Sequence, residues 1–156
     1  MDRAWWRRYA DDAEQVFRGE RVSSARGIPG VQGLKFHQGG NSGAGAMSLA
    51  EWHGARRIIL LGYDCGYAAD GKRHWHGDHP KGLGNAVSMP KWYAQFEEMA
   101  GHLGHCEIIN ASRHTALELW PRQSLEQALA DLRCGADRAR RHGDPSPEPH
   151  GDTVRV

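Results

Sequence analysis

The chain has 156 residues, 39% of them hydrophobic, with 20 Lys and Arg against 19 Asp and Glu. A chain of this length buries enough apolar surface to fold as one soluble domain. The longest apolar run, residues 58–61, is too short to cross a membrane, and Met1 opens no hydrophobic signal segment. The near-neutral charge lacks the basic footprint of a nucleic-acid binder, and the three cysteines are too few and too scattered for a disulfide framework. We therefore expect a cytoplasmic protein without a membrane span and without a nucleic-acid partner.

The first part of the chain alternates helix and loop signals. Residues 2–18 repeat apolar side chains at helical spacing and predict a helix. Residues 23–33 are rich in Gly, Ser and Pro and indicate a loop, and residues 31–36 predict a short strand. The glycine-rich run at residues 39–43 then opens a helix that we expect to end near His53.

The second part of the chain carries the clearest strand signals. Residues 57–61 (RIILL) form a short apolar run bounded by turn residues, which is typical of a buried strand. A long polar loop over residues 64–90 precedes a predicted helix at residues 91–103. Residues 106–110 (CEIIN) predict another strand, and residues 124–133 predict the last helix.

Alternating helices and strands predict an α/β fold with a parallel sheet. We expect a partial Rossmann-like three-layer fold with a short sheet, because only two or three strands are visible in the sequence. Residues 1–136 are expected to form a single α/β domain with Trp5, Trp92 and Trp120 in its core. Residues 137–156 have too little apolar content to pack and are expected to form a disordered tail.

Polar residues follow the predicted strands at residues 57–61 and 106–110. Polar residues and glycines also stand at the start of the helix predicted to begin near residue 42. In an open parallel sheet, ligands bind beyond the edge where the strands end. A glycine-rich turn at a helix start also presents backbone N–H groups to an anion such as a phosphate. Asn41 or Ser42 can equally cap the helix, and the polar residues after the strands can be ordinary turn formers. On the functional interpretation, a small-molecule nucleotide contacts Gly40, Asn41, Ser42, Gly43, Asp64, Asn110 and Ser112.

Histidines gather in the long loop, in the segment HWHGDH at residues 74–79. Its spacing resembles the zinc-binding signature of the metallo-β-lactamase superfamily, which implies a metal-dependent hydrolase. The polar residues 70–73 stand where that family has a hydrophobic strand, so we expect no required cofactor and disfavour zinc. The loop is expected to lie above the sheet edge where the ligand binds. In that place His76 and His79 are candidate catalytic bases, because a histidine side chain titrates near neutral pH. The substrate would then contact Trp75, Asp78 and Asn85; a plain solvated loop is the remaining alternative.

Three segments, residues 39–65 (GGNSGAGAMSLAEWHGARRIILLGYDC), residues 74–85 (HWHGDHPKGLGN) and a later KW pair with Phe96, occur together in this chain. Together they resemble a family of small proteins of tailed phages and prophages, sometimes labelled morphogenetic. Residues 42–64 are also similar to the core of bacterial sialyltransferases and of motility-accessory and hydroxymethylpterin-pyrophosphokinase-like domains. That resemblance implies a Rossmann-like nucleotide or nucleotide-sugar site at Asn41, Ser42, Gly43 and Asp64, with a histidine of the next loop as the base.

The start of the chain departs from these relatives. They begin with a strand and a GGGPS-like loop, and a second strand then leads into a CDxxWW-like segment. Residues 1–6 (MDRAWW) match only that last segment, so we expect the fold to lack its first βαβ unit. The leading hypothesis is a glycosyltransferase-like phage protein that binds a nucleotide sugar as its substrate. The alternatives are a non-enzymatic phage morphogenesis or accessory protein, which binds a protein or a small ligand without turnover, and the metal-dependent hydrolase. The candidate protein partners are a second copy of this chain, which would form a homo-oligomer, or another phage protein.

Overall fold

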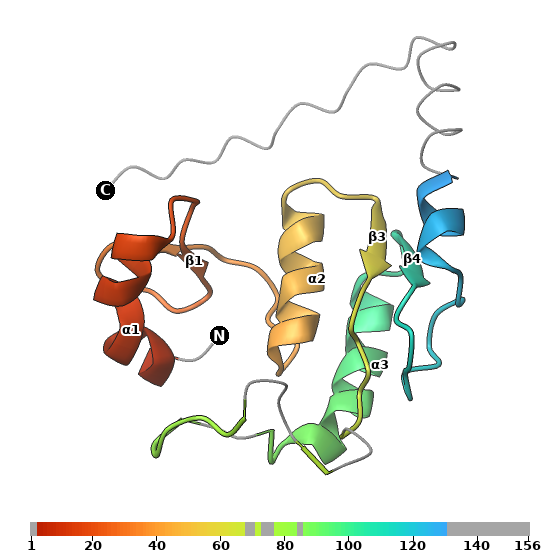
Figure 1. The fold of residues 1–156 in the computed structure, drawn as a ribbon. Helices are drawn as coiled ribbons and strands as arrows, with labels where there is room; N and C mark the ends of the chain where they lie inside the picture. The colour runs from red at the N-terminus through yellow and green to blue at the C-terminus, as the bar shows by residue number, and fades with distance from the viewer. Residues whose placement is uncertain (1–2, 68–70, 73–76, 84–85, 131–156) are drawn as a thin grey trace, which may run out of the picture.

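The computed structural model describes residues 3–67, 71–72, 77–83 and 86–130. Within them the chain combines helices with two parallel sheets of two strands each (Figure 1). This confirms the expected mixture of helices with parallel strands. The predicted tail over residues 137–156 lies outside the described residues. Among the described helices, none is both long enough and apolar enough to cross a bilayer.

The N-terminal part consists of one helix and one very small sheet. Helix α1 (Arg3–Val16) confirms the helix predicted over residues 2–18. Strands β1 (Val22–Ser23) and β2 (Gln32–Gly33) pair in parallel, and β2 lies within the predicted short strand. The sequence did not reveal β1, because two residues are too few to show an alternating pattern.

The larger part of the fold is built from two helices and two paired strands. Helix α2 (Ser42–Trp52), strand β3 (Arg57–Leu60), helix α3 (Trp92–His102) and strand β4 (Glu107–Asn110) occur where the sequence predicted them. A short 3₁₀ turn, η1 (Met89–Lys91), leads into α3. Strands β3 and β4 are parallel and in register over their whole length. Their carboxyl ends and the starts of α2 and α3 therefore lie at the same edge of the molecule, at the bottom of Figure 1.

The segment after β4 returns along the strand. Arg122 forms a β-bridge with Asn110, and residues 125–130 are helical, which agrees with the start of the helix predicted over residues 124–133. The Ser124 hydroxyl caps this helix by accepting a hydrogen bond from the Gln127 amide at 3.1 Å. The remaining residues of that prediction, 131–133, lie outside the described part of the chain.

A single apolar cluster joins the two helices to the strands. Its buried members come from α2, β3, α3, β4 and the segment after β4, and they are Ala44, Met47, Ile58, Leu60, Phe96, Met99, Leu103, Ile108 and Leu117. Trp92 and Trp120 pack against this cluster while half-buried. Trp5 is 36% exposed on α1, so its expected place in the core was wrong. The helical spacing of Trp5 predicts an apolar face but does not show what covers that face.

Two neighbouring leucines test this core. Leu60 is 1% exposed in the cluster, whereas Leu61, the next residue, is 55% exposed. Truncation of Leu60 leaves a cavity, so Leu60→Ala should lower the free energy of unfolding by about 2–5 kcal/mol. Leu61→Ala should change it by less than about 0.5 kcal/mol. Urea unfolding followed by tryptophan fluorescence measures both, and an equal loss in the two variants would contradict this description of the core.

Candidate functional site

The start of α2 is shaped by two glycines and one capping residue. Gly39 and Gly40 have φ of +65° and +79°, and a Cβ atom at Gly40 would collide with the side chain of Gln95. Asn41 is the N-cap: its Oδ1 accepts a hydrogen bond from the Ala44 amide at 2.9 Å. Its Nδ2 donates to Gln95 Oε1 at 3.0 Å, which ties the cap to α3. The capping interpretation of Asn41 is therefore confirmed.

The cap leaves other groups at this helix end available. The first N–H groups of an α-helix, here those of Ser42 and Gly43, have no intrahelical acceptor. The helix dipole adds partial positive charge at the same place. The start of α2 thus offers two backbone donors in a weakly positive field, which suits an anionic or strongly polar ligand group.

Tyr63 connects the end of β3 to this helix start. Its hydroxyl donates a hydrogen bond to the Gly43 carbonyl oxygen at 3.0 Å, and its ring lies 5.8 Å from that of Phe96. A Cβ atom at Gly43 would lie 3.1 Å from the Tyr63 ring and 3.2 Å from the Phe96 ring, so the close approach favours glycine. Burial raises the pKa of the Tyr63 hydroxyl. No sequence pattern marks Tyr63, which lies three residues after the end of β3.

Asn110 and Ser112, predicted to contact a nucleotide, both make internal hydrogen bonds, and Ser112 also lines the second cleft described below. Asn110 is fully buried; its Nδ2 donates to the Leu117 carbonyl at 3.1 Å, and its Oδ1 accepts from the Ser112 amide at 3.1 Å. The Ser112 hydroxyl accepts from the Tyr63 amide at 2.9 Å, and the Thr115 hydroxyl donates to the Tyr63 carbonyl at 2.6 Å. The hydroxyl groups of Ser112 and Thr115 therefore hold the backbone of Tyr63 in place.

These elements enclose a cleft of about 990 Å³ at the carboxyl edge of the β3–β4 sheet. The predicted site residues that line it are Gly40, Asn41, Ser42, Gly43, Asp64 and His79. The aromatic side chains that line it are Trp5, Trp6, Tyr63, Trp92 and Phe96. Trp92 is oriented by its Nε1, which donates to the Ser88 hydroxyl at 3.1 Å. The sequence thus located the polar side of the cleft but not its aromatic side.

Not all predicted site residues reach this cleft. Asp78 is exposed and is not among the described residues that line it. Trp75, His76 and Asn85 lie outside the described residues, so their predicted roles remain predictions.

A second cleft adjoins the first along the same edge. It has a volume of about 900 Å³ and shares Gly62 and Asp64 with the aromatic cleft. Its lining adds the basic side chains of Arg113 and Arg122. Arg122 is held in place because one of its terminal nitrogens donates to the Ser112 and Arg113 carbonyl oxygens, both at 3.0 Å. Asp64 therefore lies between an aromatic compartment and one that carries cationic groups.

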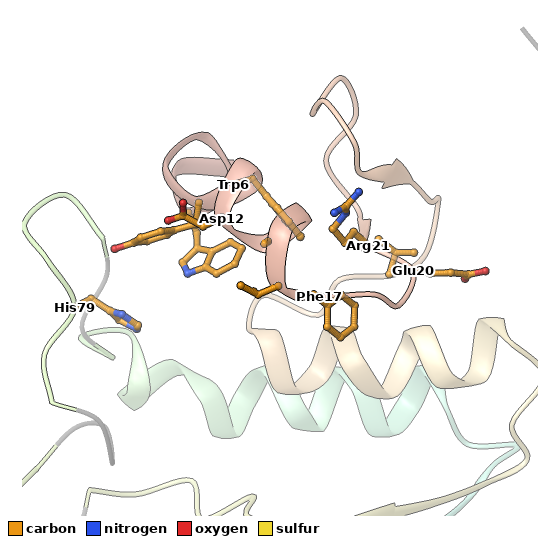
Figure 2. Close-up of a pocket in the computed structure, with 11 residues that line it drawn as sticks. Trp6, Asp12, Phe17, Glu20, Arg21 and His79 are labelled. Carbon is orange, nitrogen blue, oxygen red and sulfur yellow. The ribbon is translucent and has the colours of Figure 1, made fainter.

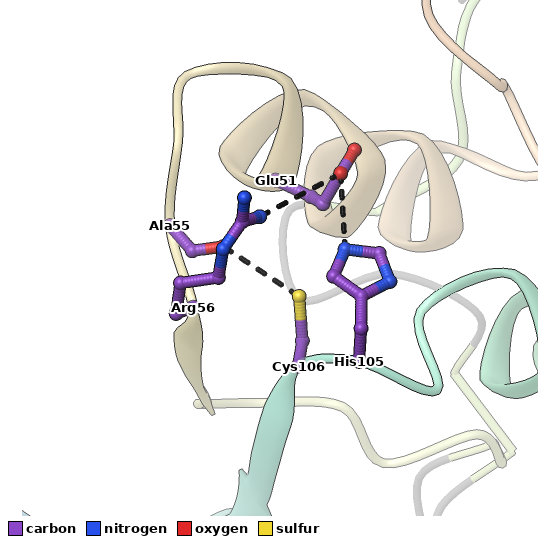
Figure 3. A network of polar contacts seen from close by, with 5 residues as sticks. All are labelled: Glu51, Ala55, Arg56, His105 and Cys106. Carbon is purple, nitrogen blue, oxygen red and sulfur yellow. Dashed lines mark hydrogen bonds and ion pairs between the residues drawn. The ribbon is translucent and has the colours of Figure 1, made fainter. Parts of the chain in front are cut away.

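The opposite edge of the sheet carries a separate polar network (Figure 3). Glu51 Oε1 lies 3.1 Å from His105 Nε2 and 3.9 Å from an Arg56 nitrogen, and the Cys106 thiol donates to the Ala55 carbonyl at 3.5 Å. Burial above all, and then the Glu51 carboxylate, raise the pKa of the Cys106 thiol, which Arg56 partly opposes. A thiol that stays protonated is a poor nucleophile, so this network ties α2 to β4 and does not resemble a catalytic site.

The described residues contain no group of three or more His, Cys, Asp or Glu side chains that could hold a metal ion. His74 and His76 of the HWHGDH segment lie outside them, so the zinc hypothesis stays untested.

No protein-family model, curated protein sequence or solved structure matches this chain. The functional interpretation therefore rests on the geometry of the cleft and on the sequence patterns.

Tyr63 provides a pH-dependent test of the hydrogen bond to α2. Burial raises the pKa of Tyr63 in the folded state above its value in the unfolded chain, which is about 10. The fold therefore keeps its full stability while Tyr63 is protonated in both states, and it loses stability as the pH rises above ~10 and the unfolded chain ionises first. Tyr63→Phe should cost about 1 kcal/mol at neutral pH and should lose less stability than the wild type above pH ~10. Urea unfolding between pH ~7 and pH ~11 measures both effects. Tyr93→Phe, at a 40% exposed tyrosine, is the control, and equal pH profiles for wild type and Tyr63→Phe would contradict the assignment.

Proposed function

We propose that the aromatic cleft binds a nucleotide or a nucleotide sugar. The observation that carries this proposal is the convergence of three kinds of group on one cleft. These are the backbone donors at the start of α2, the carboxylate of Asp64 and a set of aromatic rings. Each group matches a different part of such a ligand, and all lie at the sheet edge where α/β proteins bind ligands.

The proposed roles follow from the chemistry of each group. Trp92, or another ring of the cleft, stacks on the base or sugar, and such stacking contributes about 1–3 kcal/mol per base. The Asp64 carboxylate accepts hydrogen bonds from sugar hydroxyl groups. The N–H groups of Ser42 and Gly43 donate to phosphate oxygens. The adjoining cleft with Arg113 and Arg122 extends the site, so that the anionic part of a two-part ligand has cationic partners beyond Asp64.

The wider proposal is that of a glycosyltransferase-like phage protein in the cytoplasm of the bacterial host. In this interpretation β3, α3 and β4 belong to a Rossmann-like three-layer fold. His79, which lines the cleft, is proposed to take the proton from an acceptor hydroxyl as its oxygen bonds to the anomeric carbon; the bond from that carbon to the phosphate oxygen breaks, and the nucleotide leaves with its phosphate. The parallel β3–β4 pairing and the cleft at its carboxyl edge support this interpretation.

Calorimetric titration with CMP, UDP and their sugar conjugates tests the binding. We expect saturable binding to the wild type, and an affinity reduced at least about tenfold (~1.4 kcal/mol) in Asp64→Asn and in Trp92→Ala. Two matched changes outside the cleft, Glu97→Gln on α3 and Trp52→Ala at the end of α2, should leave the affinity unchanged.

The same panel separates the alternatives. No binding of any nucleotide or nucleotide sugar would overturn the proposal. Binding that is followed by sugar transfer, lost in His79→Ala while binding persists, supports the transferase. Binding without transfer to any acceptor supports the accessory protein. Stoichiometric zinc binding lost in His76→Ala, with no nucleotide bound, would instead favour the metal-dependent hydrolase.

A further inference from the structure

An apolar groove runs along helix α1 (Figure 2). The groove has a volume of about 570 Å³, and its apolar lining comes mainly from one face of the helix, with Trp5, Tyr9, Ala13 and Val16. Val16 is 80% exposed and Phe17, just after the helix, is 54% exposed. Large apolar side chains gathered in one exposed groove are typical of an interaction surface.

The charges on α1 are divided between its two halves. The basic residues Arg3, Arg7 and Arg8 come first, and the acidic residues Asp11, Asp12 and Glu14 follow. This order is unfavourable for an isolated helix, because the dipole favours acidic residues at the start and basic residues at the end. A second helix with the same charges, packed antiparallel, would place basic residues beside acidic ones along the whole contact. The charge pattern of α1 is therefore complementary to itself.

The spacing of Arg8 and Asp12 fits such an antiparallel pair of helices. Arg8 and Asp12 are four residues apart and so lie on the same side of the helix, at the border of the apolar face. The Arg8 guanidinium lies 5.6 Å from the centre of the Tyr9 ring, and Asp12 lines the groove. A two-fold axis beside Ala10 brings Arg8 opposite Asp12 of the second copy. The same axis places Ala4 opposite Val16 and Trp5 opposite Gln15 of the second copy, so Trp5 lies one position away from Val16 along the contact.

Within the described part of the chain, the Asp12 carboxylate and the apolar groove on α1 are available for contact with a second copy. Glu14 already pairs with Arg21 at 3.1 Å. Within the described part of the chain, Asp12 forms no ion pair with another side chain. The residues that line the groove come from α1, the strand and turn that follow it and His79, so no residue of α2 or α3 closes it.

We propose that the groove on α1 is occupied by α1 of a second copy, in an antiparallel, two-fold symmetric dimer. The interface buries the apolar face and pairs Arg8 of each copy with Asp12 of the other. This inference does not depend on the identity of the proposed ligand. Trp5, Trp6 and His79 line both the groove and the aromatic cleft, so the second copy lies against the outer wall of that cleft.

Charge exchange tests this arrangement on the full chain. Sedimentation velocity should show a dimer for the wild type. Arg8→Asp and Asp12→Arg should each weaken dimerisation at least about tenfold, because each places like charges opposite one another twice. The double variant Arg8→Asp, Asp12→Arg restores opposite charges and should dimerise again. A monomeric wild type at ~100 μM, or a double variant that is as monomeric as the single ones, would overturn the proposal.

An apolar pair of variants gives a second, independent test. Val16→Asp should abolish the dimer, whereas Val87→Asp, at a 73% exposed valine that does not line the groove, should retain it. Both positions are exposed, so neither change should unfold the chain, and circular dichroism verifies this. A dimer that survives Val16→Asp would show that another surface joins the copies and would contradict the α1 contact. Binding of a different partner chain to a monomeric wild type would contradict it as well.

Discussion

The shape of the cleft depends on a chain of hydrogen bonds that starts at one buried amide. Asn110, at the end of β4, holds the backbone of Ser112, and the Ser112 hydroxyl holds the amide of Tyr63. The Tyr63 hydroxyl then reaches the Gly43 carbonyl in the first turn of α2. One continuous chain therefore connects the end of β4, the segment after β3 and the start of α2. Buried polar groups are costly when unpaired, so each link also holds its neighbours in position.

The two edges of the β3–β4 sheet therefore differ in what lines them. At the amino ends of the strands, Glu51 and His105 connect α2 to the segment before β4, and burial raises the pKa of the Cys106 thiol. At the carboxyl ends, the parallel pairing brings both helix starts and the loop after β3 to one place. The donors, the Asp64 carboxylate and the aromatic rings then surround a volume that suits a ring-bearing ligand.

The sequence predicted the elements that carry a clear local signal and missed those that carry none. The RIILL run occurs where expected because a short apolar run bounded by turn residues indicates a buried strand, and the helix that starts at Ser42 because glycines and a capping residue mark its start. Strand β1 has two residues and leaves no pattern. Asn110 was expected at the ligand because polar residues after strands often bind ligands, but local spacing does not reveal that its amide is used internally. Trp5 was expected in the core, since helical spacing shows a face but not its partner.

The central claim is that the cleft beside α2 is the ligand site, and amide NMR tests it most directly. Addition of CMP, UDP or their sugar conjugates to the ¹⁵N-labelled chain should shift the resonances of Ser42, Gly43, Tyr63 and Asp64 most strongly. These amides lie at the helix start and in the segment after β3 that line the cleft. Unchanged resonances at these four residues under saturating ligand, or shifts confined to the Glu51–His105 edge, would contradict the account.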